Sequence, residues 1–364
     1  LTRLGGPVPD FELPRHYSRK AIRSMPPVAV MATRCTERAL EDAGLLGDPL
    51  LSSGRVGVAY GSSAGGVEAT AEFTEMLVNG TTSGINATTY IRMMAHTTPV
   101  NIGVFFGLQG RVYTTSSACT SASQGIGYAF EAIRSGAQTA MVAGGADSLS
   151  ATEAAVFDAL YATSTTNDQP DRAPRPFDRD RDGLVIGEGA GTLVLEDFEH
   201  ARARGAPIHA EIVGHGTNSD GHHVTQPSHA TMRVAMELAL ADANVNADAI
   251  DYVSAHGTAT DHGDAAEARA TREAFGRAVP ISAFKSYTGH TLGACGALEA
   301  WVTIQSLKCG WFHGTVNLDD IDPDCDGLDH ITGASGRPMA CEYAMSNNFA
   351  FGGINSSLIF RRWQ

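Results

Sequence analysis

The stretch YTTSSACTSASQGIGYAFEAIRSGAQTAMVA, residues 113–143, decides the fold class. Residues 113–117 and 139–143 are typical of strands, and residues 121–135 between them have the small and apolar side chains of a helix. A strand, a helix and another strand in this order indicate a parallel crossover unit. The stretch therefore predicts a layered α/β fold in which Cys119 lies at the turn from strand to helix.

Elements of both kinds continue on either side of this unit. Residues 28–43 have the apolar periodicity of a helix that Gly44 ends, and residues 55–60 are expected to form a short buried strand. Further strands are expected at residues 192–195, 209–213, 250–254, 281–283 and 356–360, and further helices at residues 231–243, 264–275 and 292–307. A charged segment ending in Gly-Ala-Pro separates two similar α/β halves, residues 1–206 and 207–364.

Composition and charge narrow the class of protein. The chain has 364 residues, 43% of them hydrophobic, which is enough to bury a sizeable core. The formal net charge of -14 argues against nucleic acid as a partner. No segment has the ~20 consecutive apolar residues that membrane insertion as a spanning helix requires.

The six cysteines show no C-x-x-C pair, so neither a metal site nor a secreted disulfide scaffold is expected. Five of them are expected to be ordinary small side chains, and reduced thiols suit a cytoplasmic enzyme. The exception is Cys119. A thiol at a helix N-terminus faces unpaired N–H groups, which stabilise its thiolate and make it a candidate nucleophile. The alternative is a buried structural cysteine.

Two further motifs carry histidines. In Ala-His-Gly-Thr-Ala-Thr, His256 directly follows a predicted strand and has the hydroxyls of Thr258 and Thr260 beside it. In Phe-Lys-Ser-Tyr-Thr-Gly-His, Lys285 and His290 flank a tight turn before a long helix. Either motif alone also fits a hydrogen-bonded histidine without a catalytic role. A lysine among so few charges needs a carboxylate partner, and Glu299 in the following helix is the candidate.

Two glycine-containing segments complete the set of motifs. Residues 346–355, SNNFAFGGIN, interleave two aromatic residues with small ones, which indicates a movable apolar lid or, alternatively, a simple core turn. The run Gly-Glu-Gly-Ala-Gly at residues 187–191 lacks the Lys-Ser/Thr ending of a phosphate loop. Nucleotide binding is therefore not expected.

Together and in this order, the Cys119, His256, Lys285–His290 and lid motifs resemble those of elongating β-ketoacyl-acyl-carrier-protein synthases, condensing enzymes of the thiolase superfamily. The similarity runs from about residue 17 to residue 360. It implies a thiolase-type fold, in which two α/β halves form five alternating α-β-α-β-α layers, and a homodimer. Family members begin with a strand and a glycine-rich turn that the first residues of this sequence do not match.

The resemblance also implies a role for each motif. Cys119 would carry the acyl chain as a thioester, with the backbone N–H groups of Cys119 and Phe351 as oxyanion hole. His256 and His290 would hold the malonyl thioester carbonyl and the enolate formed as carbon dioxide leaves. Lys285, paired with Glu299, would position them. Two histidines indicate the elongating class, because initiating synthases have an asparagine in place of one.

Three further sets of residues take their roles from the resemblance. The phosphopantetheine arm would be bound by threonines, and an aspartate would belong to a loop that moves with the lid. Elongating enzymes usually have glycine at the lid position of Ala350, where a Cβ restricts the backbone. The sets are Thr225, Thr258 and Thr260 for the arm, Asp220 for the loop, and Phe349, Ala350, Phe351, Gly352 and Gly353 for the lid.

The implied partner is acyl carrier protein, in its acyl and malonyl forms. Substrates would arrive on its phosphopantetheine, so no permanently bound cofactor is expected. The carrier is itself acidic, so a chain of net charge -14 needs a local basic patch to bind it. Arg19, Lys20 and Arg23 form the candidate patch, which Arg92 and Arg111 could extend; alternatively, these residues form a solvated helix face.

The sequence therefore predicts a decarboxylative Claisen condensation in fatty acid biosynthesis. A ketosynthase of a polyketide or aryl-polyene pathway stays open, since substrate choice depends on pocket depth and on the carrier that docks. A chain-length-factor-like subunit is a weaker alternative, because such a subunit would have lost the nucleophile and Cys119 is present. A degradative thiolase needs a second reactive cysteine, for which Cys325 and Cys341 have no suitable context, and a papain-like hydrolase leaves Lys285 and His290 without roles.

Overall fold

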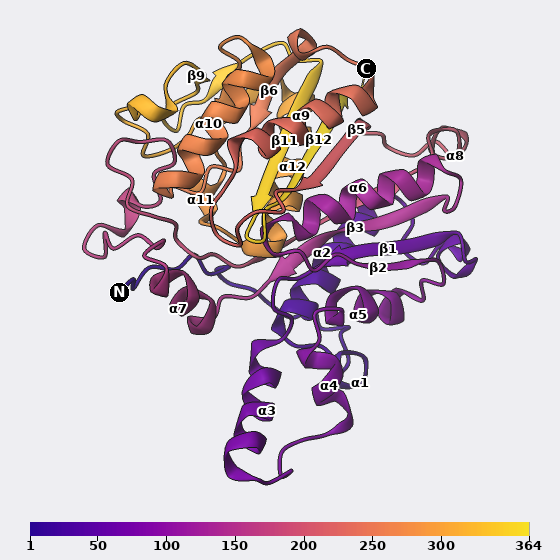
Figure 1. The fold of residues 1–364 in the computed structure, drawn as a ribbon. Coiled ribbons are helices and arrows are strands. Elements are labelled where there is room, and N and C mark those ends of the chain that lie inside the picture. Colours follow the sequence, from indigo (N-terminus) through magenta and orange to yellow (C-terminus); the bar gives the residue numbers. More distant parts are fainter. Residues whose placement is uncertain (364) are drawn as a thin grey trace.

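The computed structural model describes residues 1–363 and contains two main sheets (Figure 1). The first has the strand order β2-β1-β3-β4. Both β2 and β3 run parallel to β1, and β4 is antiparallel to β3. The predicted crossover is confirmed, with β1 lying between the two strands that the crossover joins. The bounds are Val56–Gly61 for β1, Val112–Thr114 for β2, Ala140–Asp147 for β3 and Gly189–Glu196 for β4.

The second sheet has the order β5-β12-β11-β6-β7-β9 and belongs to the second half of the chain. Its centre is the antiparallel hairpin of β11 and β12, with β6 parallel to β11. A separate two-stranded sheet pairs β8 (Trp311–Phe312) with β10 (Arg337–Pro338). The strands of the six-stranded sheet are β5 (Ala210–Ser219), β6 (Ile250–Ser254), β7 (Pro280–Ser282), β9 (Asp329–His330), β11 (Tyr343–Ala350) and β12 (Ile354–Arg362).

Helices divide the molecule into the five predicted layers (Figure 1). Two helices lie between the sheets, two cover the outer face of the first sheet, and two cover the outer face of the second. Each sheet buries both of its faces in this way, which explains its nearly continuous runs of buried residues. The central helices are α6 (Ser121–Arg134) and α12 (Cys295–Cys309), and the outer pairs are α2 (Pro27–Asp42) with α5 (Thr97–Phe106) and α9 (His229–Ala243) with α10 (Asp261–Phe275).

Small residues let the central helix α6 lie close to both sheets. A Cβ on Gly125 would come within 2.9 Å of the carbonyl oxygen of Ala59 in β1, and one on Gly127 would come within 2.3 Å of the His215 ring in β5. Ala122, Ile126 and Ala129 are fully buried in the core between the sheets. The helix that follows Cys119 is thus packed against both sheets.

Several elements differ from the sequence-based expectation. The helices α3 (Val67–Asn79), α4 (Ala87–Met93) and α7 (Ala151–Ala159) were not predicted, and α3 and α4 project from the body (Figure 1). The glycine run that ends at Gly191 leads into β4, as expected for a segment that is not a phosphate loop. Within the described residues, no helix combines the length and apolar character needed to cross a membrane.

The chain order delivers the candidate residues to one region. Cys119 lies in a short 3-10 turn, Ala118–Thr120, that comes after the carboxyl end of β2. His256 comes after the carboxyl end of β6. The lid segment turns between β11 and β12, and His290 follows the short helix α11 (Lys285–Thr288). Carboxyl ends of parallel strands are the usual place for a ligand site in α/β folds.

Candidate active site

Cys119 lies at a strained elbow directly before α6. The preceding residue, Ala118, has a φ of 50°, in the left-handed region that disfavours a side chain. Cys119 itself is only 6% exposed, and its Sγ lies 3.0 Å from Nε2 of His290. Backbone strain of this kind persists only where the surroundings hold it, and it is common at functional sites.

The tautomer of His290 follows from its second contact. The backbone N–H of Leu292 donates to Nδ1 of His290 over 3.2 Å. Nδ1 is therefore the acceptor, and in the neutral ring the proton is on Nε2. His290 thus presents an N–H donor to the sulfur of Cys119.

His256 is held in the same state by Lys285. The Nζ of Lys285 donates to Nδ1 of His256 over 3.0 Å and to its backbone oxygen over 2.7 Å. This leaves Nε2 of His256 as the second N–H donor. The two imidazole rings are nearly perpendicular, with centroids 5.2 Å apart. The sulfur of Cys119 and one nitrogen of each ring lie within 4.8 Å of one another.

Both imidazoles are kept neutral. Burial lowers the pKa of His256 well below its ordinary value, and the neighbouring charge of Lys285 lowers it further. The same two causes lower the pKa of His290. A metal ion would need Nε2 of each ring as a bare lone pair, with the proton moved to Nδ1, where Lys285 and the Leu292 N–H already donate. The arrangement therefore favours two hydrogen-bond donors over a metal site.

The expectation that Cys119 is held as a thiolate is wrong for this structure. Burial raises the pKa of its thiol to about 12, although Lys285 and the backbone N–H groups of Cys119 and Phe351 act in the opposite direction. Desolvation outweighs the helix terminus because the closed site excludes water from the sulfur. At rest the group is a thiol.

The predicted Lys285–Glu299 ion pair is present and fully buried, with side chains 2% and 1% exposed. Asn348 donates from Nδ2 to the other carboxylate oxygen of Glu299 over 2.6 Å. Cys295, one helical turn before Glu299, lies with its Sγ 3.3 Å from the carbonyl oxygen of Cys119. Cys295 was expected to be an ordinary small side chain; it is buried, and it also contacts the nucleophile.

Two buried carboxylates hold the loop that carries His256. Glu267 accepts hydrogen bonds from the backbone N–H groups of His256 and Gly257, each over 2.8 Å. Asp264 accepts from the N–H of Thr258 over 2.9 Å, and the hydroxyls of Thr258 and Thr260 lie 2.9 Å apart. The two threonines are thus together beside His256, as the phosphopantetheine prediction requires.

Asp147 ties the nucleophile half to α12, and the sequence analysis did not identify it. Its carboxylate accepts from the Ser62 hydroxyl over 2.7 Å and from the Gly293 N–H over 2.6 Å. A usable signal existed, because Asp147 is a charged residue directly at the end of the buried run Ala-Gly-Gly-Ala.

The lid is shorter than predicted. Phe349 and Ala350 are the last residues of β11, so only the turn that contains Phe351, Gly352 and Gly353 lies outside the strands. The backbone N–H groups of Phe351 and of Cys119 itself both lie within hydrogen-bonding reach of the Cys119 sulfur. These are the two donors expected for the oxyanion hole.

Two contacts hold the lid turn closed. The Phe351 ring stacks on Phe157 of α7, with centroids 5.2 Å apart. On the other side, the N–H of Asp220 donates to the carbonyl oxygen of Gly353 over 2.8 Å. Asp220 therefore does belong to the loop that contacts the lid.

Two family models match the chain: the β-ketoacyl synthase N-terminal domain over residues 5–201 and the C-terminal domain over residues 209–319. The chain belongs to the β-ketoacyl synthase family. It is 41% identical to 3-oxoacyl-(acyl-carrier-protein) synthase 2 of Vibrio cholerae, an alignment that covers 99% of this chain and 88% of that protein. Because enzymes of this family are condensing enzymes, the chain is an acyltransferase of the condensing type.

Solved structures give the same result. A β-ketoacyl synthase from Burkholderia phymatum is 58% identical, with a TM-score of 0.98 over 100% of this chain and 89% of that one. A ketosynthase solved with its type II polyketide acyl-carrier protein is 29% identical, with a TM-score of 0.86 over 99% of this chain and 88% of that one. The thiolase-type architecture expected from the motifs is confirmed.

Some expected residues of the synthase site lie apart from it. Thr225 is exposed, and no hydrogen bond in residues 1–363 joins it to Thr258 or Thr260. Its loop does reach the lid, because the N–H of Gly352 donates to the carbonyl oxygen of Val224 over 2.8 Å. For the docking patch, Arg19, Lys20 and Arg23 are all exposed on or beside α1 (Arg19–Ile22).

Arg92, which the sequence suggested as an extension of this patch, does not extend it. Its guanidinium forms an ion pair with Glu72 over 2.7 Å, and the side chain is only 18% exposed. Arg111 is exposed and donates to the Tyr113 hydroxyl over 3.1 Å. The α1 cluster therefore remains the candidate for carrier binding, and of the two suggested extensions only Arg111 stays exposed.

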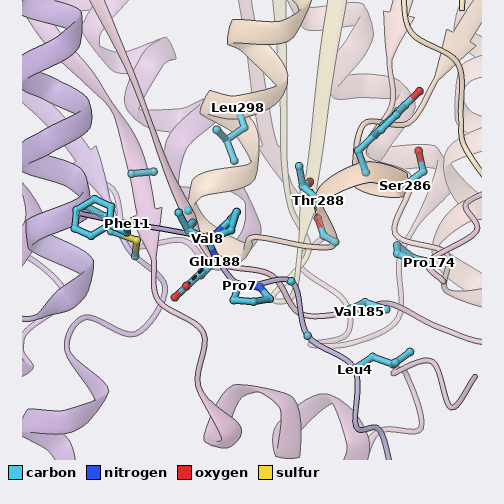
Figure 2. A pocket seen from close by; sticks show the side chains of 18 of the residues that line it. Leu4, Pro7, Val8, Phe11, Pro174, Val185, Glu188, Ser286, Thr288 and Leu298 are labelled. Atoms are coloured by element: carbon cyan, nitrogen blue, oxygen red, sulfur yellow. Dashed lines mark hydrogen bonds between the residues drawn. The ribbon is translucent and has the colours of Figure 1, made fainter. Parts of the chain in front are cut away.

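A hollow of about 780 Å³ opens beside the synthase site rather than at it (Figure 2). The N-terminal segment lines one side, where the N–H of Val8 donates to Glu188 over 3.0 Å. Thr288 and Gly289, which precede His290, line another side, but the nucleophile and both histidines do not. The catalytic cluster is thus not part of this hollow.

Proposed function

We propose that the chain is an elongating β-ketoacyl-(acyl-carrier-protein) synthase that joins an acyl chain on Cys119 to a malonyl unit on a carrier protein. One observation carries the proposal: two buried, neutral imidazoles, each with one N–H donor, lie beside a buried cysteine at a strand-to-helix elbow. A hydrolase needs one such imidazole as base. Two donors suit a reaction in which negative charge develops on one oxygen.

In the first half-reaction, Cys119 takes the acyl group. Its sulfur attacks the carrier thioester, the carbonyl oxygen gains charge in the hole formed by the N–H groups of Cys119 and Phe351, and the phosphopantetheine thiolate leaves. The proton of the Cys119 thiol ends on the departing thiol.

In the second half-reaction, malonyl thioester replaces the first carrier. The bond to its carboxylate breaks, carbon dioxide leaves, and the electron pair forms an enolate whose oxygen accepts from Nε2 of His256 and His290. The enolate carbon then attacks the acyl thioester, and the sulfur of Cys119 leaves as a thiolate that takes a proton from solvent to restore the thiol. Neutral donors suit this step, because they stabilise the developing charge without surrendering a proton to the carbanion.

The pathway assignment favours fatty acid synthesis. The relative from Vibrio cholerae, named for 3-oxoacyl carrier-protein synthesis, is 41% identical, whereas the polyketide ketosynthase is 29% identical. A polyketide or aryl-polyene substrate is the second candidate. A chain-length-factor-like subunit is disfavoured, because Cys119, His256 and His290 are all present. Substrates arrive on phosphopantetheine held by Thr258 and Thr260, and no resident cofactor is required. A cytoplasmic location stays a prediction.

The acidic carrier protein docks at α1. Arg19, Lys20 and Arg23 are exposed and none of them forms an ion pair with any described residue, whereas Arg92 is neutralised by Glu72. Since the net charge of the chain is -14, this cluster supplies the attraction. Reversing the three charges to glutamate is expected to raise KM for carrier substrates and to weaken its dependence on salt, with kcat little changed.

A second copy of the chain covers the edge of the first sheet, giving a homodimer. The edge strand β2 exposes Val112, and the neighbouring helix α5 exposes Val104. The projecting helix α3 exposes Leu77 and Val78, both at 77% (Figure 1). Apolar side chains along an open sheet edge are typical of a surface that another chain covers.

The experiment that tests the proposed function is a condensation assay with purified acyl and malonyl carrier proteins. Wild type is expected to release carbon dioxide and to form a β-ketoacyl carrier two carbons longer than the acyl donor, detected by mass spectrometry. Cys119→Ala is expected to form none. Formation of free fatty acid without carbon–carbon bond formation would instead indicate a thioesterase.

A further inference from the structure

Two buried polar side chains contact the site but have no part in the chemistry above. Asn348 lies in β11 and is fully buried, and Cys295 is the first residue of α12 and is 2% exposed. They contact different partners. Asn348 reaches the buried ion pair, and Cys295 reaches the backbone of the nucleophile. Burying a polar group is costly unless its hydrogen bonds are made, so each contact needs an explanation.

Asn348 contacts His256 directly, with its Nδ2 3.3 Å from Nδ1 of the imidazole, and also acts on it through two intermediaries. Its Nδ2 donates to Oε2 of Glu299 over 2.6 Å, while Oε1 of Glu299 takes the ion pair with Lys285. Lys285 in turn donates to Nδ1 of His256 over 3.0 Å. Asn348 therefore orients the Glu299 carboxylate, Glu299 orients Lys285, and Lys285 sets the tautomer of His256. Outer-shell partners act on metal-bound histidines in the same way.

Cys295 acts on Cys119 directly. Its Sγ lies 3.3 Å from the carbonyl oxygen of Cys119, within reach of an S–H donor. Burial raises the pKa of Cys295 well above its ordinary value, so the thiol keeps its proton. The elbow it contacts begins at Ala118, whose φ of 50° must be held by surrounding contacts.

The two contacts are nearly independent of each other. Within residues 1–363, Cys295 makes no hydrogen bond to His256, His290 or Lys285, and Asn348 makes none to Cys119. They are linked by a long contact of 3.7 Å between the Nδ2 of Asn348 and the Sγ of Cys295, and this Sγ also lies within 4.8 Å of one ring nitrogen of His256 and one carboxylate oxygen of Glu299, without a hydrogen bond to either. Changes at the two positions should therefore affect different steps.

We propose that Asn348 and Cys295 are positioning residues for different half-reactions. Asn348 serves decarboxylation by aligning Glu299, Lys285 and hence His256, and Cys295 serves acyl transfer by fixing the backbone of Cys119. This inference rests on the proposed condensation, which it extends to two residues that take no part in bond making.

The test measures the two half-reactions separately in the full-length protein. Acyl transfer is followed as the rate at which an octanoyl carrier protein adds octanoyl mass to the enzyme. Decarboxylation is followed as conversion of malonyl carrier protein to its acetyl form without acyl donor. Asn348→Ala is expected to slow decarboxylation about tenfold, and Cys295→Ala to slow acyl transfer about tenfold, each with the other rate within about twofold of wild type.

The chain offers a matched control for each variant. Asn347 is the neighbouring buried asparagine, and its Oδ1 accepts from Ser357, away from the ion pair. Cys341 is a buried cysteine whose Sγ lies 3.4 Å from the carbonyl oxygen of Tyr343, outside the site. Asn347→Ala and Cys341→Ala should change the two rates equally or not at all. Cys295→Ser, which keeps a donor, should recover most of the acyl-transfer rate.

The outcomes separate this inference from the function on which it rests. Wild type that performs neither half-reaction overturns the proposed function itself. Wild type that performs both, with each alanine variant lowering the two rates in equal proportion or neither, overturns the division of roles. Failure of Cys295→Ser to recover acyl transfer would show that packing, and not the hydrogen bond, is what Cys295 supplies.

Discussion

Lys285 occupies an unusual position for a charged side chain, because it is almost completely buried and its ion pair among the described residues is with Glu299. Its ammonium donates to Glu299 and to two atoms of His256. Burial of the ion pair is costly, and only complete hydrogen bonding compensates for it. The pair is therefore better understood as the device that orients His256 than as a source of stability.

Removing one member of this pair should be severely destabilising. Glu299→Ala leaves the Lys285 ammonium buried without a counter-charge, for which we expect a loss of about 3–5 kcal/mol in the free energy of unfolding. Urea denaturation followed by circular dichroism measures it. Glu199→Ala, which breaks the exposed pair with Arg202, is the control and should change little. Equal effects would contradict the buried character of the Lys285 pair.

The lowered pKa values of His256 and His290 predict how decarboxylation depends on pH. A histidine whose pKa in the folded protein is lowered stays neutral as the pH falls through the ordinary pKa. It becomes charged only below the folded pKa. Malonyl decarboxylation by Cys119→Ala should therefore stay constant between pH 8 and pH 6. One histidine with an ordinary pKa of ~6.5 would cost about fourfold over this range, and two that must both be neutral would cost about sixteenfold; a loss of this size contradicts neutral donors.

At the scale of single residues, the sequence predicted the side chains that lie in recognisable motifs. It missed the side chains that only the folded chain brings to the site. The Lys285–Glu299 pair was predictable because a lone buried lysine needs a carboxylate. Cys295 and Asn348 gave no such signal, since a cysteine in a helix and an asparagine before an aromatic residue are common. The thiol state of Cys119 could not be predicted, because it depends on how completely the closed lid excludes water.

Among the elements, the β11–β12 hairpin connects the lid to the site. Its first strand carries Asn348 and Phe349 into the core, and its turn presents the Phe351 N–H to the nucleophile. Gly353 allows the turn to close, because its φ is 68° and a Cβ there would lie 2.5 Å from the Cβ of Asp220. Lid position and the Asp220 loop are thus linked by a direct contact.

This contact makes Gly353→Ala a test of the lid. The substitution should displace the Asp220 loop and slow acyl transfer, measured from the mass increase of the enzyme with time. Gly221→Ala is the matched control: its φ is 60° but nothing lies within 4 Å of the added Cβ, so it should cost only about 1–2 kcal/mol of stability. Equal acyl-transfer rates in the two variants would argue against the contact.

The strand β11 was the main element that the sequence did not predict. Ser346, Asn347 and Asn348 are almost fully buried, although three consecutive polar residues are typical of a loop. The two asparagines serve the site and the neighbouring strand, because Asn348 donates to Glu299 and Ser357 donates to Asn347. Local propensity fails here because function requires hydrogen bonds inside the sheet.

For the whole molecule, the five layers place the nucleophile in one half and both histidines in the other. Asp147 joins the halves, because this residue of β3 accepts from the N–H of Gly293 next to α12. The layered architecture was predictable from alternating strands and helices. The projecting helices α3 and α4 were not, because their exposed apolar residues do not follow a buried face.

The exposed apolar edge of the first sheet predicts the oligomeric state. Wild type should sediment at twice the mass of one chain, and Val104→Asp should dissociate it, because a charge would be buried in the interface. Leu238→Asp, on the outer helix α9, is the control and should leave the dimer intact. A monomeric wild type at micromolar concentration would contradict the proposed interface.

The central claim is that Cys119 carries the acyl chain while two neutral histidines handle the malonyl unit. Intact-mass spectrometry of the enzyme after incubation with a series of acyl carrier proteins tests it most directly. We predict that one acyl mass appears on wild type, disappears in Cys119→Ala and remains in His256→Ala. Absence of acyl mass at every chain length, with malonyl carrier protein still decarboxylated, would contradict the claim and indicate an accessory role.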